Sequence, residues 1–327
     1  MGHAISWISG TSADANEAIL RDVVTEDGFC LGMKKATFST LAPGLSLDSM
    51  NRLAISAFTN GMDSLAEGQS QPVSFYAWVR SQIVIATTDA IYGDHNPFRD
   101  YRVENAWSLY KPGIPNLGPK ALPSFLTSKS VQAREYVVQA FVKFFQAGYH
   151  EQGSNLLRDR YRYIVETHQI RDLSDLARLE LTGAFASIEN TVPTAFWFFA
   201  VHVDKDTWGL NADRFNHTRF VHKSHDFAGK GSKRIGFRGF GGGYHLCPGR
   251  HFSSTEMLSL AAMLVLRFDI TPVHGTWESL GKHKTSFTGT AAPVPVKDFP
   301  VIFDRRDNKK WTFSVSGTGV EMELLAE

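Results

Sequence analysis

Cysteines are scarce in this sequence, and long apolar runs are absent. Only Cys30 and Cys247 occur among 327 residues, which disfavours a secreted framework held by disulfides and favours a reducing compartment. The longest apolar stretch, 194–203, contains His202 and is about half the ~20 residues that a membrane-spanning helix requires. The N-terminus has no basic region followed by an apolar one, as a signal peptide would. As written, the chain is therefore predicted to be soluble and cytoplasmic.

An excess of charge of either sign is also missing. Lys and Arg number 34 against 33 Asp and Glu, so no global field favours a polyanion, and nucleic acid is not an expected partner. Hydrophobic residues make up 43% of the chain, which is long enough to bury a core in one large domain or two modest ones. The 24 phenylalanines exceed what core filling strictly needs and are compatible with a large apolar ligand or cofactor cavity.

Apolar residues at helical spacing dominate the pattern along the chain. They predict helices over 45–65, 73–92, 130–147, 154–167 and 172–200, and a further helix just after Pro248 and Gly249. Ser46 or Asp48 is available as a cap for the first of these, and Gly93 and Gly148 should end the second and third. The prolines and glycines of 111–123 predict a loop, and 204–243 should be mostly irregular.

Alternating and β-branched residues near the C-terminus predict the remaining regular structure. The stretches 268–273, 299–303 and 311–315 should form a small antiparallel sheet. The expected fold class is mainly α with a small β part. The chain is expected to form a single domain over 1–327, with the helical part at 1–200 and its central helix at about 174–200.

Cys247 lies in a glycine-dense loop immediately before a predicted helix. The helix N-terminus and nearby backbone N–H groups favour a thiolate, and glycines allow a close backbone approach to a flat ligand or a turn with positive φ. The residues alone leave other interpretations open. Cys247 could be a small buried hydrophobe beside an ordinary turn, or a nucleophile paired with His245. A nucleotide-binding loop is disfavoured, because no Lys-Ser or Lys-Thr pair follows the glycines.

The whole string around this cysteine resembles the haem-binding signature F-x-x-G-x-[RH]-x-C-x-G of the cytochrome P450 family. The match covers every defined position, at Phe240, Gly243, His245, Cys247 and Gly249. The resemblance implies that Cys247 is the proximal ligand of a haem b iron, that Phe240 packs beside the thiolate, and that His245 hydrogen-bonds a haem propionate. Glu256, on the following helix, stands where relatives often have a carboxylate or an amide.

Polar residues and a proline interrupt the predicted central helix. Pro193 lacks a backbone N–H, so the carbonyl of Glu189 should be freed and the helix should kink. Ser187, Glu189, Asn190 and Thr191 would then line a polar notch. The alternative is a helix in which Ser and Thr hydroxyls hydrogen-bond to their own preceding carbonyls.

Residues 186–191 resemble the oxygen-activating pattern A-[GS]-x-[DE]-T-T of the same family. Asn190 departs from it by replacing an alcohol, as in the sterol 7- and 12-hydroxylase and prostacyclin synthase branch, which is the most similar branch suspected. The resemblance implies that Glu189 and Thr191, with a water held by Asn190, relay protons as catalytic residues. Because that branch includes hydroxylases and a peroxide isomerase, Asn190 leaves the reaction type open.

Segments after the central helix resemble the family's H-R-D-x-x-x-W and D-x-F-x-P-E-R-F motifs, and Arg219 matches the arginine of the second. The family locks this arginine beside the haem loop with an E-x-x-R motif, but no Glu in this sequence is followed three residues later by Arg. The expected fold is therefore a cytochrome P450 fold truncated at the N-terminus and lacking the E-x-x-R helix region. Arg219 is assigned to the cofactor-binding residues, and Cys30 to packing.

The leading functional hypothesis is a haem-thiolate monooxygenase that oxidises a hydrophobic small molecule, such as a sterol, a terpenoid or another secondary metabolite. The resemblance implies O2 as co-substrate, NADPH-cytochrome P450 reductase or another electron donor as partner, and the endoplasmic reticulum membrane as the location of eukaryotic relatives. Two alternatives are a haem-thiolate isomerase or dehydratase that needs no reductase, and a non-catalytic remnant.

Overall fold

The chain is described from a computed structural model of its 327 residues. The structure describes residues 2–21, 25, 28–67, 71–117, 124–189, 240, 246–274, 300–306, 311–316 and 321–326. Two compact units are distinguished. The first comprises Met1–Ile188, Pro248–Gly281 and Lys297–Glu327, and the second comprises Glu189–Cys247 and Lys282–Val296. The architecture below is that of the first unit.

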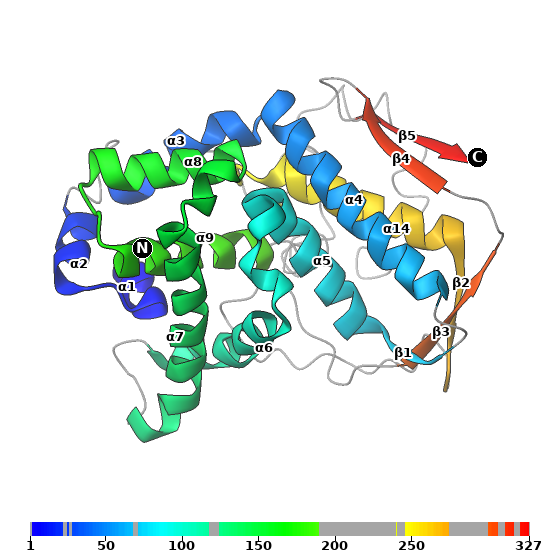
Figure 1. Ribbon diagram of the computed structural model, residues 1–327, viewed down its shortest axis with the longest axis horizontal. Coiled ribbons are helices and arrows are strands. Elements are labelled where there is room, and N and C mark those ends of the chain that lie inside the picture. Colours follow the sequence, from blue (N-terminus) through cyan, green and yellow to red (C-terminus); the bar gives the residue numbers. More distant parts are fainter. Residues whose placement is uncertain are drawn as a thin grey trace, which may run out of the picture. The chain divides into compact units, whose positions relative to one another are not determined.

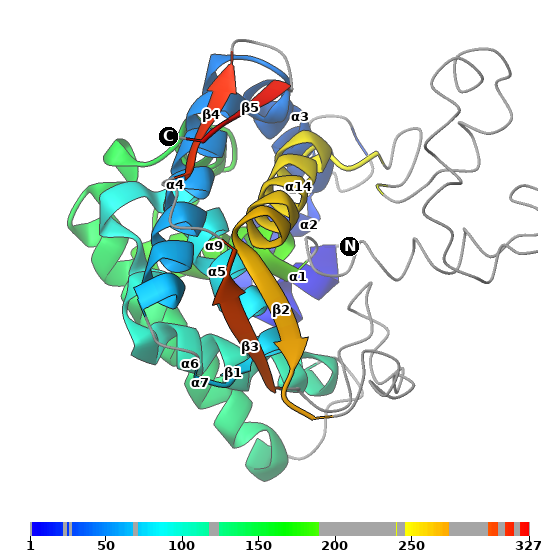
Figure 2. The same ribbon diagram turned by 90° about the vertical axis from the view of Figure 1, so that its right-hand side faces the viewer.

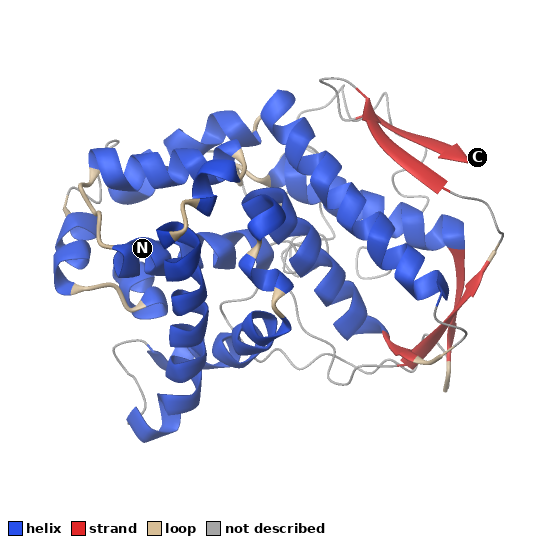
Figure 3. Cartoon of the chain, in the orientation of Figure 1, coloured by secondary structure: helices blue, strands red, loops and turns tan. Residues whose placement is uncertain are grey.

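Helices dominate the described residues, as the sequence predicts (Figure 3). They are α1 (Gly2–Ser9), α2 (Ala13–Leu20), α3 (Phe29–Leu41), α4 (Leu45–Glu67), α5 (Phe75–Tyr92), α6 (Tyr101–Tyr110), α7 (Ser124–Gln146), α8 (Asn155–Arg162), α9 (Leu173–Glu189) and α14 (Arg250–Arg267). The mainly helical fold class is therefore confirmed.

Local signals placed several helix ends correctly. Helix α5 ends at Gly93, whose φ of 69° lies in the left-handed region that glycine adopts without strain, and Gly148 after α7 has a φ of 73°. Ser154 caps α8 by accepting a hydrogen bond from the backbone N–H of Leu157. The prediction that Ser46 or Asp48 caps α4 was wrong. Both lie inside its first turn, where the Asp48 N–H donates to the carbonyl of Gly44 (3.0 Å).

Three other boundaries differ from the predictions. Residues Lys111–Leu117, predicted as a loop, form a 3-10 helix, because prolines are tolerated in such short tight turns. Helix α7 begins at Ser124, one and a half turns before the predicted start at 130. The helix predicted over 154–167 changes at Tyr163–Thr167 into a π-helical turn. The segments 190–200 and 204–239, predicted as the end of the central helix and as irregular structure, lie outside the described residues.

The strands form two small antiparallel sheets rather than one. Strand β3 (Pro300–Arg305) pairs with β2 (Phe268–Pro272) on one side and with the two-residue strand β1 (Val73–Ser74) on the other. Strand β4 (Trp311–Ser316) pairs with β5 (Glu321–Ala326), which the sequence pattern did not reveal. Phe303 of β3 packs on Phe268 and on Trp78 of α5, with ring centroids 5.6 and 5.4 Å apart. The three-stranded sheet is thus joined to α5 by aromatic contacts.

Helices α4, α5 and α14 lie side by side and form a layered core (Figures 1 and 2). Their contacting faces are apolar and include Ala54, Phe58 and Met62 of α4 and Leu260 and Met263 of α14, all buried. Burial of apolar side chains on this scale is the main source of stability. Arg267 at the end of α14 forms a salt bridge with Asp63 of α4, which fixes the register of the two helices.

Aromatic rings fill a second part of the core, between α5, α6 and α7. Tyr92, Phe98, Trp107 and Phe141 are almost completely buried, and the ring centroids of Tyr92 and Phe141 lie 5.3 Å apart, edge to face. Part of the aromatic surplus in the composition therefore serves core packing rather than a ligand cavity.

A buried polar cluster anchors the central helix α9. Glu180 of α9 accepts hydrogen bonds from the hydroxyl of Tyr92 (2.8 Å) and from the guanidinium of Arg160 in α8. All three side chains are buried. Ser12, which caps α2, also binds α9 by donating its backbone N–H and its hydroxyl to the carboxylate of Asp175 (2.8 and 2.6 Å). Four helices are thereby held together through α9.

Among the helices that the structure describes, none is both long and apolar enough to span a membrane.

Candidate functional site

The cysteine loop is closed by one backbone hydrogen bond. The N–H of Cys247 donates to the carbonyl of Phe240 at 2.8 Å, so these two residues, seven positions apart, lie side by side. The Cys247 side chain is half-buried and forms no disulfide. Pro248 and Gly249 make a turn, and α14 begins at Arg250. A thiol is therefore held three residues before the start of an 18-residue helix.

Gly249 is the N-cap residue of α14. Its φ of −80° lies outside the left-handed region, so the interpretation that a loop glycine provides positive φ does not apply at this position. What Gly249 contributes is the absence of a side chain beside the helix N-terminus, whose backbone dipole favours negative charge. His251 follows in the first turn, and partial burial together with adjacent Arg250 lowers its pKa.

Among the described residues of this loop, Cys247 offers a single thiol as a metal ligand. Within the described residues, no group of three or more His, Cys, Asp or Glu side chains is placed to hold a metal. A single thiolate can hold an iron whose in-plane ligands come from a porphyrin, whereas structural zinc requires four protein ligands. The half-buried Cys247 on a closed loop thus fits the proximal ligand of a haem.

The predicted catalytic residues are only partly described. Glu189 is the last described residue of α9, and its side chain is 5% exposed. Two residues earlier along the chain, the Ser187 hydroxyl donates to the carbonyl of Gly183 (3.0 Å), which is the back-bonded alternative for this helix. Asn190 and Thr191 lie outside the described residues, as do Pro193 and its expected kink.

The predicted cofactor-binding residues divide in the same way. Phe240, Cys247 and Gly249 are described, whereas Arg219, Gly243 and His245 lie outside the described residues. The assignment of these six residues to haem binding stays a prediction.

Sequence reasoning singled out Glu256 but missed its partner. Glu256 lies in the second turn of α14, is 1% exposed, and accepts a hydrogen bond from the Thr87 hydroxyl of α5 (2.7 Å). Burial raises the pKa of Glu256 to about 8, and only the Thr87 hydrogen bond opposes this shift. The two residues are 169 positions apart, so no local pattern connects them.

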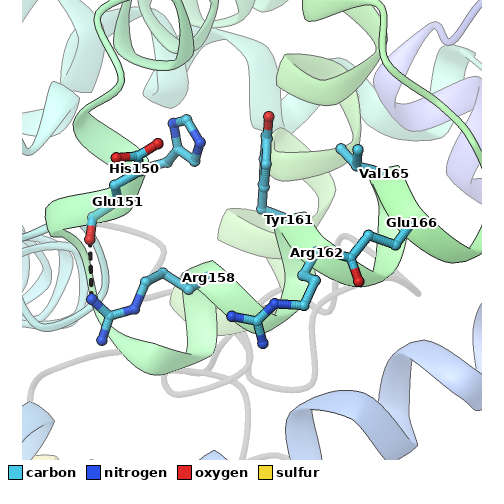
Figure 4. A pocket seen from close by; sticks show the side chains of 7 residues that line it. All are labelled: His150, Glu151, Arg158, Tyr161, Arg162, Val165 and Glu166. Carbon is cyan, nitrogen blue, oxygen red and sulfur yellow. Dashed lines mark hydrogen bonds between the residues drawn. The ribbon is translucent and has the colours of Figure 1, made fainter.

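A surface pocket of the first unit carries mixed charges (Figure 4). It is lined by His150, Glu151, Arg158, Tyr161, Arg162, Val165 and Glu166. The Arg158 guanidinium donates to the carbonyl of Glu151 (3.0 Å), and the His150 ring packs on Tyr161 with centroids 4.1 Å apart. Burial lowers the pKa of His150. This polar lining does not suit a large apolar substrate, and it contains none of the predicted site residues.

Comparisons with known proteins agree with the cysteine loop. The cytochrome P450 family model matches residues 160–295. The cytochrome P450 monooxygenase nodJ of Hypoxylon pulicicidum is 24% identical over 379 residues, covering 86% of this chain and 73% of that protein. A cytochrome P450 monooxygenase of Gibberella zeae is 20% identical, covering 74% of this chain and 64% of that protein, just under two thirds of its length.

The solved structure of retinoic acid-bound cyanobacterial CYP120A1 shares the fold. It superposes with a TM-score of 0.63 at 16% identity, covering 83% of this chain and 78% of that one. None of these names supports the narrower resemblance to sterol 7- and 12-hydroxylases or prostacyclin synthase. The fold is that of the cytochromes P450. The cytochrome P450 family model and the two named monooxygenases show that the sequence is similar to the cytochrome P450 superfamily.

Proposed function

We propose that this chain is a haem-thiolate monooxygenase that hydroxylates a hydrophobic small molecule. The observation that carries the proposal is the cysteine loop, in which a half-buried thiol is held by the Cys247–Phe240 hydrogen bond just before α14. The monooxygenases among its relatives support the same reaction class.

In this proposal the loop residues divide the work of holding haem b. The Cys247 sulfur binds the iron, and Phe240 packs beside that sulfur. Gly243 and Gly249 keep side chains away from the haem face, while His245 donates a hydrogen bond to a propionate and Arg219 lies beside the haem loop. Backbone N–H groups near the sulfur would tune how strongly the thiolate donates electrons.

Bound haem would supply the oxidation, in which a substrate C–H bond, O2, two electrons and two protons yield C–OH and water. NADPH-cytochrome P450 reductase, or another donor, would provide the electrons. The chain's own share is to hold the substrate, exclude bulk water and deliver protons. The buried Glu189 carboxyl would hold a proton, which the Thr191 hydroxyl, with a water on Asn190, would pass to the O2 side of the site.

The substrate class follows from the same chemistry. A haem pocket closed to water favours an apolar molecule such as a sterol, a terpenoid or another secondary metabolite. The fungal origin of the two similar monooxygenases, from Hypoxylon pulicicidum and Gibberella zeae, fits secondary metabolism.

Haem titration of the purified chain tests the cofactor assignment. Cys247→Ser should abolish stoichiometric binding with a thiolate spectrum, whereas Cys30→Ser, which removes the other cysteine, should leave it unchanged. Equal spectra for Cys247→Ser and the parent chain would refute the ligand. Turnover with reductase and NADPH, compared with turnover by peroxide alone, then separates a monooxygenase from an isomerase.

A second candidate is a non-catalytic relative. The aligned stretch with nodJ spans 379 residues, more than the 327 of this chain, so nodJ has residues within it that this chain lacks. The sequence also lacks the E-x-x-R motif that would pair with Arg219, which likewise favours a non-catalytic relative. A chain that folds cooperatively but takes up no haem would favour this candidate.

A further inference from the structure

Glu256 is a buried carboxyl group with a single hydrogen-bond partner. Thr87 donates to its Oε1, and Oε2 has no partner within the described part of the chain. A fully buried, charged carboxylate would require several donors, since desolvation of the charge is expensive. The geometry therefore suits the uncharged acid.

Among the residues that the structure describes, none offers Glu256 a compensating positive charge. The charged side chains described on α4, α5 and β2, the elements packed against α14, are Asp48, Arg52, Asp63, Arg80, Asp89 and Asp269. None of these contributes to the pKa of Glu256, which burial raises and the Thr87 hydrogen bond lowers. At neutral pH the carboxyl group is therefore protonated.

Helix α14 is held by polar contacts at two levels. The Arg267–Asp63 salt bridge fixes its C-terminal end to α4, and the Thr87–Glu256 hydrogen bond fixes its first half to α5. The first half matters because α14 begins three residues after Cys247. The position of this half of α14 therefore sets where the chain that follows Cys247 begins its helix.

We propose that Glu256 is a positioning residue that, while uncharged, holds the first half of α14 on α5 and thereby fixes the attachment of the Cys247 loop. This inference rests on the proposed function only because it assigns Cys247 to the site. Its test does not involve haem, so it can be refuted even if haem binds.

Ionisation then couples to local opening. In water a Glu carboxyl titrates near 4.3, whereas buried Glu256 titrates at about 8. Opening that exposes Glu256 therefore becomes about tenfold more favourable with each pH unit between roughly 5 and 8, and levels off above 8. Accessibility of the Cys247 thiol should follow this profile.

Thiol labelling measures that accessibility directly. In the full chain with Cys30→Ser, Cys247 is the only thiol, and a neutral maleimide reports its exposure without haem. Rates are divided by those of the same chain carrying Glu256→Gln, because this ratio cancels the titration of the thiol itself. Because Cys247 is half-buried, the folded chain also labels at a constant rate, and we expect the ratio to rise from pH 6 to 8 as opening adds to this rate, and to be constant above pH 8. A ratio that does not change with pH overturns the proposal.

Thr87→Val provides a second, isosteric test. It removes the hydrogen bond that lowers the pKa of Glu256, so the plateau in the labelling rate should move above pH 8. If Glu256 has a purely structural role, Thr87→Val would change the labelling rates but not the pH at which they level off. If Glu256→Gln does not fold, the labelling rates of Thr87→Val are compared with those of the parent chain instead. The same levelling-off pH in both chains refutes the proposal. Loss of haem binding with an intact pH profile would refute only the proposed function.

Discussion

Two buried glutamates, Glu180 on α9 and Glu256 on α14, are stabilised in opposite ways. Glu180 receives a guanidinium and a phenol, from Arg160 and Tyr92. Within the described part of the chain, Glu256 receives a hydrogen bond from the Thr87 hydroxyl alone. Burial raises the pKa of both, but Arg160 and Tyr92 oppose the shift at Glu180, whereas at Glu256 one neutral hydrogen bond opposes it.

The two glutamates hold their helices in different ionisation states. Glu180 joins α5, α8 and α9 through a charged pair, and removal of one member leaves a buried charge without a partner. Glu256 joins α14 to α5 as a neutral acid, so its contribution depends on pH. The central helix α9 is thus held by an ion pair, and α14, the helix after the cysteine loop, by a hydrogen bond to a protonated carboxyl group.

The largest expected effect comes from Arg160→Met. It leaves Glu180 buried without its guanidinium, and the free energy of unfolding should fall by about 3–5 kcal/mol in urea titrations. Arg162→Met is the matched control, because this residue of the same helix is 58% exposed and should cost about 0.5 kcal/mol or less. A loss below about 1 kcal/mol for Arg160→Met would mean that Glu180 is a neutral acid like Glu256.

Glu256→Gln should change how stability depends on pH. The folded-state pKa of about 8 exceeds the unfolded value, so the folded chain binds the proton more tightly and its stability falls as pH rises from 5 to 8. The contribution is of the order of 4 kcal/mol over that range, and the Gln variant should lack it. Urea titrations of both chains at pH 5, 6.5 and 8 measure the difference. Parallel pH profiles would contradict the neutral state of Glu256.

Tyr92→Phe should have the smallest effect of the three. It removes one hydrogen bond to the Glu180 carboxylate and should cost about 2 kcal/mol, because hydrogen bonds to charged groups are stronger than neutral ones. Tyr110→Phe is the control, since this buried hydroxyl donates to the neutral carbonyl of Ile8 (2.7 Å), and it should cost about 1 kcal/mol. Equal losses in thermal unfolding would argue against a charged Glu180.

Sequence patterns captured the local features of this fold and missed its long-range pairs. Glycine marked the C-terminal end of α5, and proline and glycine marked the start of α14, because these effects depend on neighbouring residues alone. The start of α5 was predicted two residues too early, since Val73–Ser74 pair with β3 as strand β1. Thr87–Glu256 and Arg160–Glu180 join residues 169 and 20 positions apart, and neither side chain type signals its partner. Strand β5 was missed because the polar–apolar alternation of 321–326 extends over only its first four residues, a short signal at the end of the chain.

In the candidate site, too, the local features could be predicted and the long-range contacts could not. The loop around Cys247 could be identified because its defining residues are close in sequence, and its closing bond to Phe240 spans only seven positions. The link from α14 to α5 that we propose to position this loop depends on tertiary packing, which no motif encodes.

The central claim, that Cys247 binds haem iron, is tested most directly by the carbon monoxide difference spectrum of the reduced, purified chain. The account predicts a Soret band near ~450 nm, the signature of thiolate-ligated haem, in the parent chain and in Cys30→Ser but not in Cys247→Ser. Absence of the band after haem supplementation, or its persistence in Cys247→Ser, would contradict the account.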